Sequence, residues 1–195
     1  ASIGEGHGNR IRLIKELRFP HSIGLFYSAM TQYLGFEVNS DEYKVMGLTP
    51  NGEPKYLDKL LGRVLDLKED GSIALNLDYF SYTHGLSMIN GRLTAHLGRP
   101  ARSQHEALDQ FHMDMAASVQ HIASEVMLRL ARTARKMTGR DTLCMAGGVA
   151  LNCVGNGAIY RDGSFRDIYI QPAAGDAGGA IGAALAVWHQ VMGQP

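Results

Sequence analysis

The hydrophobic pattern of the second half of the chain predicts helices that alternate with short strands. Apolar side chains recur every three or four residues over 104–138, which predicts one long helix that ends at Gly139. Two short apolar runs, 142–146 and 167–171, are each followed by a segment with helical spacing. Strands that alternate with helices pair in parallel. We therefore expect these two strands to be neighbours, with helices covering both faces and the long helix packed against them.

The first half predicts smaller elements. Apolar and polar residues alternate on both sides of a glycine-rich turn at 6–9, which indicates a hairpin of two strands. A strongly apolar helix should run from Ser22 to about Gly35, and a second should begin after Ser40 as its N-cap. Residues 55–102 carry mixed short segments, and we interpret them as an insertion. The predicted fold class is α/β, with a hairpin-led mixed sheet flanked by helices.

Composition and charge exclude several classes of partner. The 195 residues fit one domain that includes the insertion 55–102, and 19 basic side chains balance 19 acidic ones. This balance argues against nucleic acid or an anionic membrane as a partner, and no apolar run of about 18 residues is present to cross a bilayer. Cys144 and Cys153 are expected to be buried and reduced, which favours a cytoplasmic protein. A start at Ala1 within a strand pattern leads us to expect a fragment of a longer protein.

Two glycine-rich sequences lie where the predicted strands meet the helices that follow them. "AGGVALN" comes after the first strand and "PAAGDAGGA" after the second. Ligands bind beyond the carboxyl ends of parallel strands, and helix N-termini there attract phosphate, so both sequences should border one cleft. Gly147 and Gly148 would let the backbone approach a ligand, and Asn152 would offer an amide. Neither sequence matches the dinucleotide-binding pattern or the phosphate-binding loop.

Asp176 is the one acidic residue among these glycines. An acid at a phosphate site repels the ligand unless a cation lies between them, so Asp176 is a candidate metal ligand or general base. The alternative is an aspartate that caps the last helix, with the glycines serving only close packing. The pattern alone leaves both interpretations open.

The eight histidines do not predict a metal site of their own. His105, His112 and His121 fall on the predicted long helix, but His121 is rotated away from the other two. His21 follows a proline at the start of a helix, and we favour a structural role over a capping or substrate-facing one. For His7 we favour a surface loop over a place at the border of the acceptor pocket.

Three longer stretches carry a family resemblance. They are "FPHSIGLFYSAMTQYLGFEVNSDEYKVMGL", "AGGVALNCVGNG" and "PAAGDAGGAIGAAL". Through them the chain resembles the O-carbamoyltransferases of nodulation-factor and antibiotic biosynthesis, the NodU/CmcH type, over roughly residues 19–54 and 110–190. The resemblance implies a half-domain of the actin/sugar-kinase/Hsp70 (ribonuclease H-like) superfamily, similar to the first domain of the threonylcarbamoyl-tRNA transferases.

The same resemblance implies a two-step reaction. Carbamoyl phosphate and ATP would give carbamoyl adenylate in a second, C-terminal domain, and the first domain would pass the carbamoyl group to a hydroxyl of a sugar or antibiotic.

The family also implies roles for individual residues. By similarity, Asp176 would ligate a divalent iron beside the phosphate, Glu42 would hold the ribose hydroxyls and Lys44 would assist. The adenylate itself would be held by the residues of the two glycine-rich junctions, namely Gly147, Gly148, Val149, Asn152, Gly175 and Gly178.

The chain also departs from the family pattern. The family's other iron ligands include a His-x-x-x-His pair, and here no two histidines are four residues apart. We also expect the C-terminal adenylate-forming domain to lie outside these 195 residues. We therefore expect this chain to be the second half of the first domain, incomplete without the missing halves of its parent enzyme; a homodimer is compatible with it. Acceptor recognition would reside in the insertion 55–102.

Two other functions stay open at this point. One is an actin-like or sugar-kinase-like ATP-dependent phosphotransferase, because that superfamily uses its cleft for several ATP reactions. Such an enzyme would need a catalytic aspartate and Mg²⁺ in an acceptor half. The other is a non-catalytic nucleotide-binding module that retains the fold.

Overall fold

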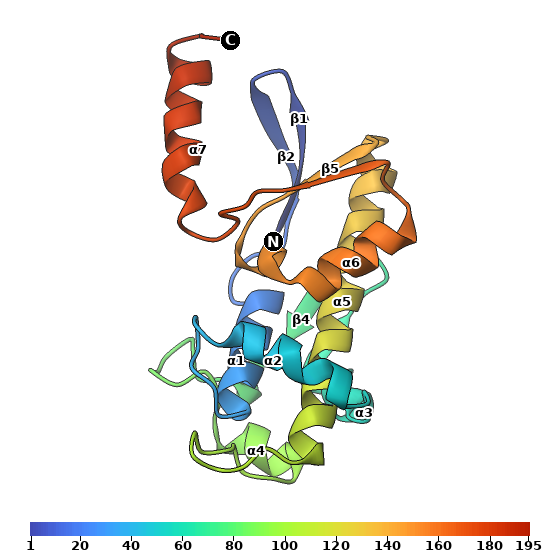
Figure 1. Cartoon of the computed structure of the whole chain (residues 1–195), viewed down its shortest axis with the longest axis vertical. Coiled ribbons are helices and arrows are strands. Elements are labelled where there is room, and N and C mark those ends of the chain that lie inside the picture. Colours follow the sequence, from blue (N-terminus) through green and yellow to red (C-terminus); the bar gives the residue numbers. More distant parts are fainter.

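The chain forms a long molecule arranged along one helix, α5 (Gln110–Thr138), in the computed structural model of residues 1–195 (Figure 1). The elements before it are the strands β1 (Ser2–His7), β2 (Arg10–Glu16), β3 (Leu65–Leu67) and β4 (Ile73–Leu75) and the helices α1 (Ile23–Tyr33), α2 (Glu42–Leu48), α3 (Leu57–Leu60) and α4 (Gly91–Leu97). After it come β5 (Thr142–Met145), α6 (Cys153–Asp162), β6 (Asp167–Ile170) and α7 (Gly178–Ala186). Short helical turns are η1 (Thr49–Asn51), η2 (Leu77–Tyr79), η3 (Gly148–Leu151) and η4 (Val187–Val191).

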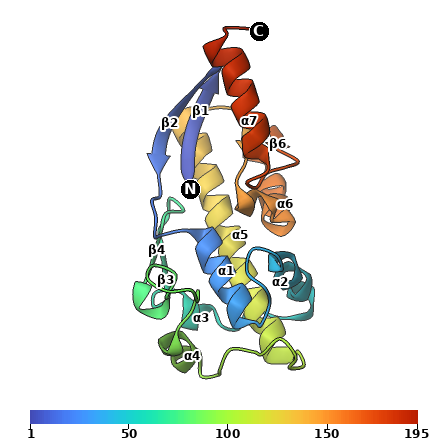
Figure 2. The same cartoon turned by 90° about the vertical axis from the view of Figure 1, so that its left-hand side faces the viewer.

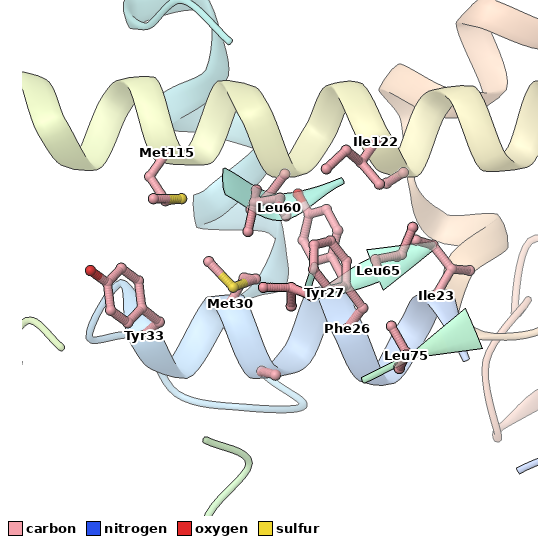
Figure 3. Packing of buried hydrophobic residues seen from close by; sticks show 14 of the residues in the cluster. Ile23, Phe26, Tyr27, Met30, Tyr33, Leu60, Leu65, Leu75, Met115 and Ile122 are labelled. Carbon is pink, nitrogen blue, oxygen red and sulfur yellow. The ribbon is translucent and has the colours of Figure 1, made fainter. Parts of the chain in front are cut away.

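The main core lies between α1 and the first half of α5. Helix α1 turns Phe26, Met30 and Tyr33 toward Met115 and Ile122 of α5 (Figure 3). All five side chains are at most 1% exposed. Burial of a large apolar side chain stabilises the fold by about 1.5–3 kcal/mol, so this pair of helices anchors the lower part of the molecule (Figure 2).

The segment 55–102 closes the same core. It contains α3, β3, β4, η2 and α4, the mixed short elements that its sequence predicts. Leu60, Leu65 and Leu75 from these elements are buried against α1 and α5 (Figure 3). The interpretation of this segment as an insertion stays a prediction.

The N-cap predicted for α1 is confirmed, whereas the one predicted for α2 is wrong. Helix α1 begins after Ser22 as predicted, and the Ser22 hydroxyl accepts a hydrogen bond from the backbone N–H of Leu25 at 3.3 Å. Ser40 is not the cap of α2, because the residue before the helix is Asp41, whose carboxylate bonds elsewhere.

Helix α5 begins at Gln110 rather than at the predicted residue 104 because Asp109 caps it. The carboxylate of Asp109 accepts a hydrogen bond from the backbone N–H of His112, and the Nδ1 of His112 accepts one from the backbone N–H of Asp109. This reciprocal capping box satisfies two donors that the helix leaves free. At the other end Gly139, with φ 68°, stops the helix where the sequence predicts.

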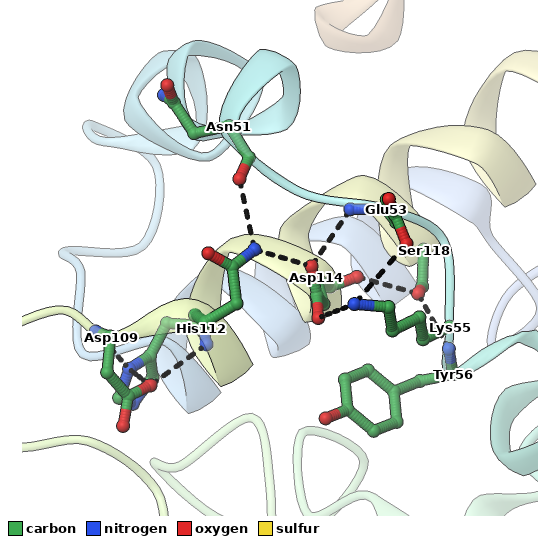
Figure 4. Close-up of polar contacts among 9 residues, drawn as sticks. Asn51, Glu53, Lys55, Tyr56, Asp109, His112, Asp114 and Ser118 are labelled. Carbon is green, nitrogen blue, oxygen red and sulfur yellow. Dashed lines mark hydrogen bonds and ion pairs between the residues drawn. The ribbon is translucent and has the colours of Figure 1, made fainter.

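A buried polar cluster fixes the segment between α2 and α3 on α5 (Figure 4). The carboxylate of Asp114 accepts hydrogen bonds from the backbone N–H of Glu53 at 2.9 Å and from the ammonium group of Lys55 at 3.1 Å. One turn further along α5, the hydroxyl of Ser118 accepts one from the backbone N–H of Tyr56 at 3.0 Å. The bond from Glu53 and the neighbouring donors hold the pKa of Asp114 below its usual value.

The predicted pairing of strands is confirmed. β5 and β6 are parallel, with Thr142 opposite Asp167 and Met145 opposite Ile170, and β1 and β2 form the antiparallel hairpin. They do not join into one mixed sheet, because the strands form three separate two-stranded sheets. The α/β class is thus confirmed, whereas the actin-like superfamily assignment stays a prediction.

Only one face of the β5–β6 pair is packed. Leu143 and Ile168 lie against a second small core between α5 and α6, so the long helix does pack on these strands. The opposite face carries Cys144 and Tyr169, and both are exposed. The prediction of helices on both faces is therefore wrong for this chain, and so is the predicted burial of Cys144 and of Cys153, which is exposed as well.

Helix α7 explains this difference. It leaves β6 through a turn and lies beside the β1–β2 hairpin instead of on the strands (Figure 1). None of its residues is buried, and the segment after it is joined to the hairpin turn, where the Asn9 amide donates a hydrogen bond to the carbonyl of His189 at 3.1 Å. No helix of the chain has both the length and the apolar character needed to cross a membrane.

Candidate functional site

The two glycine-rich junctions lie side by side. Each follows a strand of the parallel pair, and the backbone N–H of Gly147 donates a hydrogen bond to the carbonyl of Ala174 at 2.6 Å. Gly147 precedes η3, and Ala174 lies in the turn that leads to α7. The junctions are thus brought together at the carboxyl ends of β5 and β6, where the sequence places them.

Different features of the structure account for the presence of glycine at the positions of the two junctions. Gly147 has φ 102°, a conformation that residues with a side chain rarely adopt. At Gly178 an added Cβ would lie 2.2 Å from the carbonyl oxygen of Ala173, so packing requires glycine there. An added Cβ would meet only an ordinary contact at Gly175, and no atom within 4 Å at Gly148. Conformation and packing within this chain therefore explain Gly147 and Gly178 but not Gly148.

Val149 and Asn152 face the protein. Val149 lies against the start of α1, where its Cγ2 would be 3.2 Å from a Cβ added at Gly24. Asn152 is 7% exposed and caps α6, because its Oδ1 accepts a hydrogen bond from the backbone N–H of Gly155 at 2.9 Å. The amide is also bonded to Gln120, which leaves one of its N–H groups without a partner in this chain. Asn152 thus holds the loop in shape, and direct contact with a ligand stays a prediction.

Asp176 is exposed in the turn just before α7. Its carboxylate forms no hydrogen bond or ion pair within the chain, and the residue at the N-cap of α7 is Ala177, without a side-chain cap. The alternative in which Asp176 caps the last helix is therefore not observed. The carboxylate is therefore accessible to a ligand or a cation near the N-terminus of α7.

Glu42 and Lys44 lie in the first turn of α2. One carboxylate oxygen of Glu42 accepts hydrogen bonds from the Ser28 hydroxyl at 2.8 Å and from the backbone N–H of Asn39 at 2.9 Å. The ammonium group of Lys44 forms an ion pair with Asp41 at 2.8 Å, which raises the pKa of Lys44 and lowers that of Asp41. The second oxygen of Glu42 has no hydrogen-bond partner in the chain, so Glu42 retains an acceptor for a ligand.

The titratable side chains do not assemble into a metal centre. No three His, Cys, Asp or Glu side chains lie close enough together to hold a metal ion. His105 lies before α5, His112 belongs to the capping box and His121 is exposed. His21 is structural as predicted, because its Nδ1 accepts a hydrogen bond from the backbone N–H of Leu75 at 3.1 Å.

Two polar residues that the sequence does not single out support this region. Gln120 on α5 is bonded to Asn152 and also accepts a hydrogen bond from the Tyr27 hydroxyl at 2.9 Å. Burial, with smaller contributions from Glu42 and Cys153, raises the pKa of Tyr27 well above its usual value. The phenol thus stays protonated and donates. A glutamine among the apolar positions of a long helix is the signal that could have revealed this arrangement.

A model of the carbamoyltransferase N-terminus matches residues 2–185 of the chain. The chain belongs to this carbamoyltransferase family. Among its relatives, an uncharacterised protein of Synechocystis sp., sll1178, is 55% identical over 98% of this chain and 31% of that protein. The nodulation protein NolO of Bradyrhizobium diazoefficiens is 37% identical over 97% of this chain and 32% of that protein.

A third relative, the nodulation protein NolNO of Sinorhizobium fredii, is 34% identical over 95% of this chain and 26% of that protein. The chain therefore spans between about a quarter and a third of the length of the curated relatives it matches. The family resemblance carried by the three sequence stretches is confirmed.

Proposed function

We propose that this chain is the part of an O-carbamoyltransferase that holds carbamoyl adenylate while the carbamoyl group moves to a hydroxyl of a sugar or antibiotic. The observation that carries the proposal is the junction of the two glycine-rich turns, tied by the bond from Gly147 to Ala174. Next to that bond lie Gly148, where the chain leaves space, and Asp176, whose carboxylate has no partner.

The charge at this place supports a phosphate with a cation. Helix α7 begins here, and the positive end of its dipole favours an anion, while the N–H groups of its first two residues, Gly178 and Gly179, donate to carbonyls of the preceding turn. A phosphate charge and the Asp176 carboxylate a few ångströms apart repel each other by about 4 kcal/mol at an effective dielectric near 20. A bridging cation removes this repulsion, and the family resemblance makes divalent iron our proposal.

The residues of this chain do not by themselves fit an iron site. Asp176 offers one carboxylate, and no further His, Cys, Asp or Glu pair lies with it. We therefore propose Asp176 as one ligand, with the others in the rest of the full-length protein, and derive no reaction step through the metal.

The proposed transfer moves one group between two oxygens. The acceptor hydroxyl oxygen bonds to the carbamoyl carbon, the bond from that carbon to the phosphate oxygen breaks, and AMP leaves. The hydroxyl proton passes to a base. Gly148 and Asn152 would hold the adenylate, and Glu42, with one carboxylate oxygen unbonded, would meet the ribose hydroxyls. The adenylate would be made from carbamoyl phosphate and ATP elsewhere in the full-length protein, which we place in the cytoplasm with these substrates.

The first experiment compares two glycine variants of the full-length protein by AMP titration. At Gly148 and at Gly91, which begins α4 far along the chain, an added side chain meets no atom within 4 Å. Gly148→Val should weaken AMP binding about tenfold or more, because the side chain occupies space needed by the ligand, whereas Gly91→Val should not. Equal affinities of both variants and the wild type would argue that the nucleotide does not occupy the space beside Gly148.

The second experiment decides between the reactions. Full-length protein is incubated with ATP, carbamoyl phosphate labelled in its carbamoyl carbon, and a panel of hydroxylated sugars and antibiotics. Label in the acceptor supports carbamoyl transfer. Transfer of the ATP γ-phosphoryl group instead would support the phosphotransferase alternative, and AMP binding without either product would support a non-catalytic module.

A further inference from the structure

We infer that Gln120 is a positioning residue for the loop 147–152, and that it ties this loop to α1 beneath the proposed nucleotide site. The inference rests on the proposed function, because it adds a support to that same site. Gln120 lies in the middle of α5 and is 1% exposed, so it acts through its neighbours and not through contact with a ligand.

The carboxamide of Gln120 uses both of its polar atoms. Its Nε2 donates hydrogen bonds to the Oδ1 of Asn152 and to the hydroxyl of Ser124, both at 3.0 Å. Its Oε1 accepts one from the Nδ2 of Asn152 at 3.1 Å and one from the hydroxyl of Tyr27 at 2.9 Å. Two buried amides therefore face each other through two reciprocal bonds, an arrangement in which loss of one partner leaves several polar atoms unsatisfied.

The direction of every bond in this network is fixed. The backbone N–H of Gly155 can only donate, so the atom of Asn152 that faces it must be Oδ1. The amide nitrogen of Gln120 must then face the same Oδ1, which places the Gln120 oxygen opposite the Asn152 nitrogen. Tyr27, whose hydroxyl stays protonated, donates to that oxygen. The network accordingly holds Asn152 in one orientation.

Helix α1 carries the other side of the proposed site as well. Tyr27 reaches Asn152 through Gln120, and the next residue, Ser28, donates a hydrogen bond to Glu42 at 2.8 Å. One turn of α1 thus supports Asn152 and Glu42, two of the residues proposed to contact the nucleotide. Gln120 is the connection from that turn to the glycine-rich loop.

The test uses the full-length protein and AMP as the probe, with binding measured by calorimetry and stability by urea unfolding. Gln120→Leu keeps the size of the side chain but removes all four hydrogen bonds, and AMP should bind about tenfold more weakly. Ser118→Ala is the matched control: it removes a buried polar group two residues earlier on α5 that is bonded only to Asp114 and Tyr56. Its AMP affinity should stay within about twofold of the wild type.

Two further variants separate positioning from general destabilisation. If Gln120 acts through Asn152, the losses of AMP affinity in Gln120→Leu and Asn152→Ala should not add in the double variant. Gln120→Glu keeps the acceptor for Tyr27 but turns an oxygen toward the Asn152 Oδ1. Its AMP affinity relative to the wild type should recover as the pH falls, because the protonated carboxyl donates again.

The outcomes are distinct. A wild-type protein that does not bind AMP overturns the proposed function and this inference with it. Binding by the wild type together with an unchanged affinity in Gln120→Leu, or with fully additive losses in the double variant, overturns this inference alone. A Gln120→Leu variant that is unfolded leaves the decision to Gln120→Glu, whose pH-independent AMP affinity would likewise overturn it.

Discussion

The backbone N–H of Gly147 is bonded to the carbonyl of Ala174 at 2.6 Å, and this bond ties together the ends of two parallel strands. Gly147 makes it with φ 102°, in a region of backbone conformation that is open to glycine. The next residue, Gly148, has no neighbour that would exclude a side chain. Gly147 is thus required by the backbone conformation, whereas Gly148 is proposed to be required by the bound ligand.

Gly147→Ala should lower the free energy of unfolding by about 1–3 kcal/mol, because the new side chain strains the backbone at a positive φ. Gly148→Ala should change it by less than about 0.5 kcal/mol, because the added methyl group meets no atom. Urea unfolding followed by circular dichroism measures both. Similar destabilisation in the two variants would contradict the claim that the backbone conformation requires glycine at 147 but not at 148.

Asp176→Asn should leave stability within about 0.5 kcal/mol of the wild type, since the carboxylate is exposed and unbonded. Under the proposed function, the same change in the full-length protein should abolish carbamoyl transfer while formation of carbamoyl adenylate continues. Glu37→Gln is the control, because Glu37 is also exposed and its carboxylate is not hydrogen-bonded. Transfer that survives Asp176→Asn at the wild-type rate would refute the role of this carboxylate.

Asp114→Ala should lower the free energy of unfolding by about 1–3 kcal/mol at neutral pH, because the backbone N–H of Glu53 and the ammonium group of Lys55 lose the buried carboxylate that accepts their hydrogen bonds. The folded-state pKa of Asp114 is lowered, so this stability is complete above the unfolded-state pKa and is lost as the pH falls through the folded one. The advantage of the wild type over the variant should therefore shrink below about pH 4. Urea unfolding from neutral to acid pH measures it, and a pH-independent difference would count against the cluster in Figure 4.

The wild type should lose stability as the pH falls from about 7 to about 5, and the His112→Gln variant should lack this loss. Burial lowers the pKa of His112 in the folded chain, although the carboxylate of Asp109, 2.7 Å from Nδ1, acts in the opposite direction. The unfolded state thus binds the proton more readily, and stability falls as the pH drops. A glutamine at this helix position keeps an acceptor for the capping box without titrating. Thermal unfolding of both proteins at the two pH values tests this, and parallel losses would contradict it.

The sequence by itself determined the parts of the fold that depend on neighbours along the chain. Gly139 stops α5 and Ser22 caps α1, because caps and helix stops are local. The short apolar runs before the two glycine-rich junctions predicted the parallel pair β5–β6, and the sequences of these junctions indicated the family.

Only the tertiary structure decided what depends on contacts far apart along the chain. Gln120 meets Asn152 across 32 residues and Tyr27 across 93, and no periodicity reports such partners. The exposure of one face of β5–β6 could not be predicted for the same reason. A short apolar strand has the same sequence pattern whether helices cover one of its faces or both. Hydrogen bonds between distant side chains and the coverage of a sheet are settled by which elements meet in space.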